Sequence, residues 1–370
     1  MSPVPAEQPP LELEDRAARR RSHAAQSSTS PPRYNERVNP PRDYGDVGAE
    51  YAAVRTAVGI VDRRDWSVVE VTGRDRAAFL HALLSNEVKA LAPGQGCAAT
   101  LLDVHGKVQA LVFVWVLEDR IRLVTPPGLG APLVEQLDKY LFAEKVELRD
   151  ASGEWALLLL AGPGAEATAE RIAGVRPGEP AWSHVAGRLE GEEVRLVRGG
   201  GETGGPEVWL STPATLGAKA WSGALAEGAR PVGLTALESL RIEAGTPAFG
   251  RDVDATVLLP EVPTASLVSH SKGCYPGQEV VVRIRDRGHV NRMLRGLVLD
   301  GDTVPPPGAE VRAGGSAIGR VTSAVSSLGL RRPIALAFVR REHAQPGTRV
   351  DVAVNGRAAT ATVSDLPFTR

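Results

Sequence analysis

Residues 272–279 read Lys-Gly-Cys-Tyr-Pro-Gly-Gln-Glu, and we refer to this stretch as the signature segment. Proline fixes φ and glycine tolerates positive φ, so Pro276–Gly277 predicts the central pair of a type II turn. Gly273 leaves room for a ligand to approach closely. Residues two apart in an extended segment point to the same side, so we expect the Lys272 amine and the Cys274 thiol to share one face.

The chemistry of this segment predicts an anion site with a reactive thiol. A nearby ammonium stabilises a thiolate, and four arginines follow, at 283, 285, 287 and 292. Such a site suits a ligand with carboxylates, such as a glutamyl tail. The alternative is a buried structural cysteine beside a surface lysine. Only six of the 43 basic residues are lysines, which favours a specific need for a compact amine at this turn.

Composition excludes several classes of protein. The chain has 370 residues, 43% of them hydrophobic, and a formal net charge of −1, which argues against general binding to nucleic acid. No apolar run reaches membrane-spanning length, and the first residues do not resemble a signal peptide. Two cysteines, Cys97 and Cys274, exclude a disulfide scaffold and a four-thiolate metal site within one chain. We therefore expect a cytoplasmic protein with no membrane contact.

Three regions follow from the pattern along the chain. Residues 1–36 are rich in proline and serine and predict a disordered tail. Residues 37–291 mix strands and helices without regular βαβ alternation, which predicts an α+β region. Residues 292–370 hold about six short β-rich pieces separated by turns, which predicts a small β-barrel. Within it, Asn355–Gly356 is a hairpin signal.

Several chemical motifs are missing. The seven histidines are scattered, so we expect no dedicated metal site. No G-x-S-x-G nucleophile elbow occurs. The glycine-rich stretch 199–205 lacks dinucleotide-binding spacing and predicts a flexible loop.

The signature segment resembles the signature of the YgfZ family of folate-binding proteins. These are relatives of the glycine-cleavage T-protein, an aminomethyltransferase, and are implicated in maintaining iron–sulfur enzymes. The segments 237–250, 83–87 and 91–96 also resemble this family. The resemblance implies a three-lobed α+β fold around a central opening, ending in a small barrel. It also implies a helix after the signature segment, although Val280–Val282 favours a strand.

The resemblance further implies that the protein binds tetrahydrofolate or a derivative, with Cys274 as a functional thiol. The residues expected at the folate are Lys272, Gly273, Tyr275, Gly277, Gln278, Glu279, Arg283, Arg285 and Glu207. The implied role is that of an accessory protein in iron–sulfur cluster assembly or repair. Its expected partners are a reduced folate and iron–sulfur enzymes or their assembly factors.

An active transferase is the main alternative. T-proteins carry G-G-x-x-D-D-L, whose aspartate assists methylene transfer, but the matching positions here are Ala110 and Leu111. Neither side chain can exchange protons, which argues against aminomethyltransferase activity. A carboxylate from Asp103 or Glu243 would keep that reaction open. A non-catalytic scaffold with a vestigial folate pocket is a third possibility.

Overall fold

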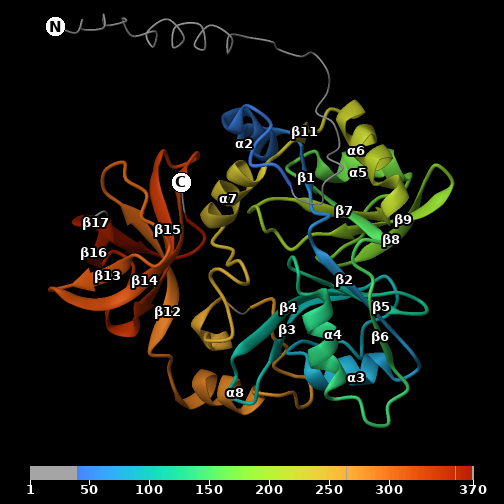
Figure 1. Cartoon of the computed structure of the whole chain (residues 1–370), viewed down its shortest axis with the longest axis horizontal. Coiled ribbons are helices and arrows are strands. Elements are labelled where there is room, and N and C mark those ends of the chain that lie inside the picture. Colours follow the sequence, from blue (N-terminus) through green and yellow to red (C-terminus); the bar gives the residue numbers. More distant parts are fainter. Residues whose placement is uncertain (1–39, 264, 355, 369–370) are drawn as a thin grey trace, which may run out of the picture. The chain divides into compact units, whose positions relative to one another are not determined.

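The computed structural model describes residues 40–368 except 264 and 355, so the predicted tail at 1–36 lies outside the described residues. The described residues form two β-sheets and a closed β-barrel, with helices packed against the sheets (Figure 1). Within the described residues, no helix is long and apolar enough to span a membrane. The α+β fold class with a closed C-terminal barrel is confirmed.

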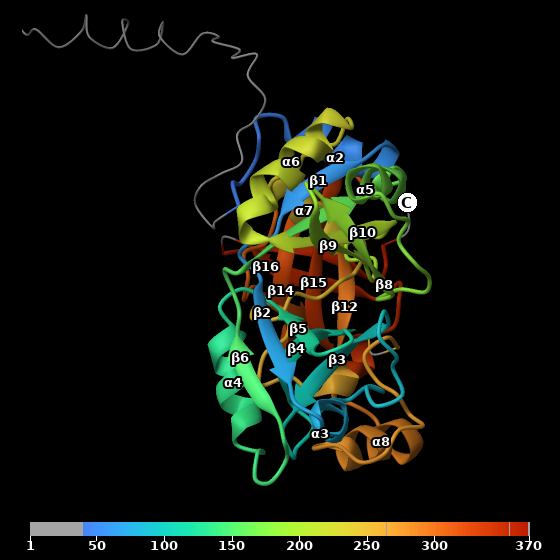
Figure 2. The same cartoon turned by 90° about the vertical axis from the view of Figure 1, so that its right-hand side faces the viewer.

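A five-stranded sheet forms the first lobe. Its strands are β2 (Ser67–Thr72), β3 (Gly96–Leu102), β4 (Val108–Val116), β5 (Ile121–Thr125) and β6 (Glu147–Asp150), in the order β3-β4-β5-β2-β6. Two helices, α3 (Arg76–Leu83) and α4 (Gly130–Asp138), cover one face of this sheet and share a core with it (Figure 2). Helix α4 ends at Asp138, with Lys139 as its C-cap.

A six-stranded sheet forms the second lobe, in the order β11-β1-β7-β10-β9-β8. Its strands are β1 (Gly59–Asp62), β7 (Trp155–Ala161), β8 (His184–Leu189), β9 (Glu192–Arg198), β10 (Glu207–Pro213) and β11 (Arg230–Pro231). Helices α5 (Ala165–Ala173) and α6 (Gly217–Ala226) pack on one face. The other face meets the first lobe and the helices α2 (Val47–Thr56) and α7 (Leu234–Glu243) through a shared core.

An aromatic cluster lies in that shared core. Trp66 stacks on Phe113 with ring centroids 5.3 Å apart, and Phe113 stacks on Trp182 at 4.2 Å. Trp209 packs against Trp66 at 5.1 Å. These rings join the two sheets, so their main role is to bury apolar area between the lobes.

The barrel closes in the order β12-β15-β14-β13-β16-β17. Its strands are β12 (Arg292–Leu299), β13 (Glu310–Ala313), β14 (Ser316–Ser327), β15 (Arg332–Arg340), β16 (Arg349–Val354) and β17 (Arg357–Ser364). Their number agrees with the six short β-rich pieces expected from the sequence. Val354 pairs with Arg357, which gives the expected two-residue hairpin connection.

Candidate functional site

The signature segment forms the predicted turn and then a helix. The Gln278 N–H donates to the Tyr275 carbonyl at 3.2 Å, and Gly277 has φ 76° and ψ −3°, as the third residue of a type II turn requires. Helix α8 (Gln278–Arg287) starts directly after it. The three valines therefore lie in a helix despite their strand propensity, because the turn starts a helix there and Val281 is buried on its inner face.

The turn packs against the connection between β3 and β4. A Cβ added at Gly277 would lie 2.4 Å from the Asp103 carbonyl oxygen and 2.8 Å from the Gly106 Cα. Only glycine fits this approach and adopts the left-handed backbone at low cost. The signature segment is thus fixed on the first lobe.

Lys272 is anchored in the first lobe. Its Nζ donates hydrogen bonds to the carbonyls of His81 and Leu84, at the end of α3. The amine lies 4.9 Å from the ring centre of Tyr275. Burial lowers the pKa of Lys272 to about 8, while the charge of Glu87 acts in the opposite direction.

The thiol two residues later is exposed, whereas the lysine is buried with 7% of its surface accessible. Lys272 and Cys274 are near enough to interact electrostatically, but they do not share one exposed face. The arrangement is also the reverse of a buried cysteine beside a surface lysine. The structure therefore presents Cys274 to solvent on a turn that the Lys272 amine holds in place.

The remaining signature residues surround this turn with mixed exposure. Tyr275 and Gly277 are buried, Gln278 is half-buried, and Gly273 and Glu279 are exposed. Arg283 and Arg285 are exposed on α8, and Arg285 pairs with the neighbouring Asp286 at 2.5 Å. The segment and its helix thus bring nine of the predicted residues into one region.

The tenth predicted residue, Glu207, lies at the start of β10 in the second lobe. Its carboxylate accepts hydrogen bonds from the backbone N–H groups of Gly201 and Glu202 at 3.1 and 2.9 Å, and from the Thr203 hydroxyl at 2.7 Å. Burial, and then the charge of Glu202, raise the pKa of Glu207 to about 7. In this structure Glu207 organises the glycine-rich loop.

Two residues beside the signature segment were not singled out from the sequence. The His81 Nδ1 lies 2.9 Å from a carboxylate oxygen of Glu87. The His81 Nε2 would lie 3.8 Å from a Cβ added at Gly273. No spacing rule links His81 to a turn more than 180 residues later in the chain, so only the tertiary structure reveals this neighbour.

Two domain families match the chain in sequence. The GCVT N-terminal domain matches residues 24–272, and the glycine cleavage T-protein C-terminal barrel domain matches residues 292–369. The chain belongs to the glycine cleavage T-protein family.

Relatives of this T-protein family member cover most of its length. An aminomethyltransferase of Thermus thermophilus is 34% identical over 89% of this chain and 92% of its own. A putative chloroplastic transferase of Arabidopsis thaliana is 29% identical over 85% of this chain and 72% of its own. The crystal structure of the glycine cleavage system aminomethyltransferase T from Bartonella henselae matches with a TM-score of 0.78 and 24% identity, over 87% of this chain and 89% of that chain.

The positions that match the T-protein aspartate motif carry no carboxylate. Ala110 is buried in β4 and pairs with Leu101, and Leu111 follows it in the same strand. Asp103 accepts from the backbone N–H groups of His105 and Lys107, both at 2.9 Å, so it shapes its own turn. A carboxylate for methylene transfer would therefore have to come from another part of the chain.

Glu243, the other carboxylate considered from the sequence, joins three elements. It accepts from the Tyr51 hydroxyl at 2.6 Å, from Arg55 at 2.8 Å and from the Ser327 hydroxyl at 2.7 Å. The Gly329 N–H adds a further bond at 3.1 Å. These contacts tie α2, α7 and the end of β14 together, which is a structural role.

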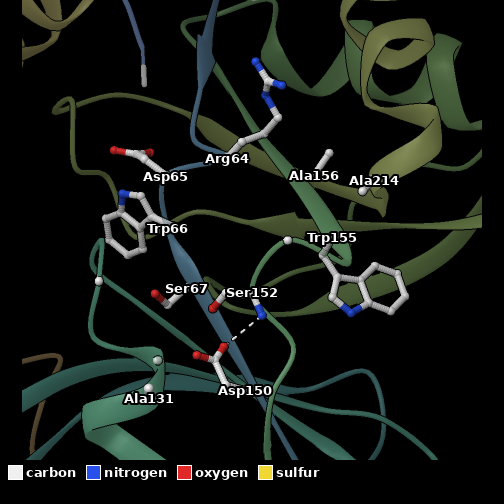
Figure 3. A pocket seen from close by; sticks show the side chains of 13 residues that line it. Arg64, Asp65, Trp66, Ser67, Ala131, Asp150, Ser152, Trp155, Ala156 and Ala214 are labelled. Carbon is white, nitrogen blue, oxygen red and sulfur yellow. Dashed lines mark hydrogen bonds between the residues drawn. The ribbon is translucent and has the colours of Figure 1, made fainter. Parts of the chain in front are cut away.

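A cavity of about 480 Å³ lies between the two sheets, away from the signature segment (Figure 3). Asp65, Trp66 and Ser67 line one side of it and Trp155 the other. The Asp65 Oδ1 is buried without a hydrogen-bond partner among the described residues, and burial raises the pKa of Asp65 to about 6. In the part of the chain that the structure describes, no group of three or more His, Cys, Asp or Glu side chains is arranged to hold a metal ion.

Proposed function

We propose that this protein is a cytoplasmic, folate-binding accessory protein of the YgfZ type that supports iron–sulfur cluster assembly or repair. The observation that carries the proposal is the exposed Cys274 thiol on a turn anchored by Lys272, in a T-protein fold that has Ala110 where the transferase carboxylate would be. The chain keeps the T-protein fold but lacks the carboxylate that would transfer protons in the transferase reaction.

The residues present fit a reduced folate in two respects. Gln278, half-buried at the start of α8, offers a side-chain amide that can both donate a hydrogen bond to a pterin ring and accept one from it. The exposed Arg283 guanidinium on α8 can pair with a glutamyl carboxylate. When bound, the folate would supply one-carbon chemistry, while these residues bind and orient it.

The cysteines support a role that depends on partners. Cys97 is partly buried, and burial raises its pKa to about 12, whereas Cys274 is exposed. One accessible thiol cannot hold a conventional cluster alone, so a cluster handled here needs ligands from an iron–sulfur enzyme, an assembly factor or a small thiol.

Aminomethyltransferase activity is the second candidate, and the names of the relatives favour it. Catalysis would then need a carboxylate at the reacting group, and Asp103 and Glu243 are both engaged in structural hydrogen bonds. Methylene transfer to tetrahydrofolate by the purified protein, above the uncatalysed rate, would establish this second function.

Two experiments test the proposal. Calorimetric titration with tetrahydrofolate and 5-formyltetrahydrofolate should show binding that Arg283→Gln weakens, and no binding by the folded wild type would favour the scaffold alternative. In a deletion strain, Cys274→Ala should lose iron–sulfur enzyme activity as completely as the deletion does, while Cys97→Ala should restore it. A fully functional Cys274→Ala variant would remove the thiol from the proposal.

A further inference from the structure

A second cavity, of about 240 Å³, lies where β5 of the first lobe meets β9 and β10 of the second. Its lining includes Arg122, Trp155, Glu193, Arg195 and Ser211. None of these residues belongs to the signature segment or to the predicted folate contacts. On β7 and β10, Trp155 pairs with Pro213 and Ala161 pairs with Glu207, so this cavity and Glu207 lie at opposite ends of these two strands.

Two arginines line the cavity although both are almost fully buried. Arg122 is 5% exposed and Arg195 is 6% exposed. Burial lowers the pKa of Arg122 to about 10; the Glu70 carboxylate, 3.2 Å away, raises it, and the charge of Arg195 lowers it further. Two buried cations at one cavity are costly unless negative charge compensates them.

Among the residues that the structure describes, negative charge compensates these two arginines only in part. Glu70 is shared among Arg120, Arg122 and Arg149. Arg195 pairs with Glu193 at 2.7 Å, but the Glu193 side chain is 63% exposed, and such a pair contributes little in water. The other contact of Arg195, with the His184 Nδ1 at 3.1 Å, adds no negative charge.

Three hydrogen-bond donors around the cavity have no partner among the described residues. They are the Arg195 Nε, the Ser211 hydroxyl and the Trp155 indole Nε1, and all three atoms are buried. They come from three different strands, β9, β10 and β7. Buried donors without acceptors cost free energy, so three of them on residues that line one cavity point to a ligand rich in acceptors.

We propose that this cavity binds a small oxyanion, either free phosphate or sulfate or the phosphate group of a small metabolite. The two guanidinium groups supply positive charge, and the Arg195 Nε and the Ser211 hydroxyl supply donors. The Arg122 guanidinium lies 3.4 Å from the centre of the Trp155 ring, which fixes its plane. The exposed Glu193 competes with the anion for Arg195 and swings into solvent when the anion binds.

The test is a calorimetric titration of the full chain with inorganic phosphate at constant ionic strength. Ser211→Ala should weaken phosphate binding by about tenfold or more, because a donor to a charged acceptor is lost. Ser222→Ala, an exposed serine on α6, is the matched control and should leave the affinity unchanged. Glu193→Gln should strengthen binding several-fold, and the surface variant Glu190→Gln should not.

The outcomes decide the proposal without relying on a buried arginine variant that could fail to fold. Saturable phosphate binding with opposite effects of Ser211→Ala and Glu193→Gln supports the site. Sulfate and glycerol phosphate, titrated in parallel, distinguish a free oxyanion from a phosphate monoester. No saturable binding of any of the three by the folded wild type overturns the proposal, as does phosphate binding that neither variant changes, because the cavity then holds only water.

Discussion

The side-chain amine of Lys272 donates a hydrogen bond to the backbone carbonyl of Leu84, 188 residues earlier in the chain. Leu84 is the C-cap of α3, whose last carbonyls have no partner within the helix. The lysine therefore completes a helix of the first lobe and at the same time fixes the turn that carries Cys274. Any functional effect of changing Lys272 includes this structural contribution.

Replacing Lys272 by methionine should lower the free energy of unfolding by about 2–4 kcal/mol, because the carbonyls of His81 and Leu84 lose their donor in a buried place. Urea unfolding measures the loss. The exposed Lys89→Met is the control and should change stability by less than about 0.5 kcal/mol. Equal stability of the two variants would show that the amine is not a structural donor.

Substituting Gly277 by alanine should be more costly than the same change at Gly347. Both glycines have positive φ, 76° and 87°, but a Cβ at Gly347 has open space, while one at Gly277 meets the Asp103 carbonyl. We expect Gly347→Ala to lower the free energy of unfolding by about 1–2 kcal/mol, and Gly277→Ala to lower it by about 2 kcal/mol more than that. Thermal unfolding of both variants gives the comparison, and equal losses would argue against close packing of the turn.

The two thiols should react at very different rates with iodoacetamide. Cys274 is exposed, whereas Cys97 is partly buried and its raised pKa leaves almost no thiolate at neutral pH. Peptide mapping by mass spectrometry should find Cys274 modified first, and Cys97 only after unfolding. Comparable labelling of both in the native protein would contradict the burial of Cys97.

Glu207 should make stability depend on pH in a defined direction. Its pKa is raised from 4.5 to about 7, so the folded state keeps the proton longer than the unfolded state. The free energy of unfolding of the wild type, relative to that of Glu207→Gln, should therefore be highest at a pH below the pKa of the unfolded chain. It should fall as the pH rises through 7. The fall is up to about 3 kcal/mol. Urea unfolding across this range measures it, with the exposed Glu135→Gln as a control that shows no such trend.

Glu243 should prove structural and not catalytic. Glu243→Gln disrupts the ion pair with Arg55 and the hydrogen bond from the Tyr51 hydroxyl. We expect it to lower the free energy of unfolding by about 3 kcal/mol or more. The exposed Glu342→Gln in the barrel should be neutral. If Glu243→Gln kept full stability and lost only a measured transferase activity, the catalytic alternative would regain support.

The sequence alone determined the features that depend on neighbouring residues. Pro276–Gly277 specified its turn because the allowed backbone angles of these two residues are local properties. The alternating strands and turn residues after Met293 specified the six barrel strands for the same reason. The missing carboxylate at Ala110 was also visible in the sequence, through the resemblance to the T-protein family.

Only the tertiary structure decided which residues meet. The burial of Lys272 against α3 and the place of His81 beside Gly273 depend on contacts between segments more than 180 residues apart in the chain. The cavity at Arg122 and Ser211 combines side chains from both sheets. Periodicity records which face of an element is buried, but it holds no information about the partner on the other side, so these sites emerge only when the elements are packed together.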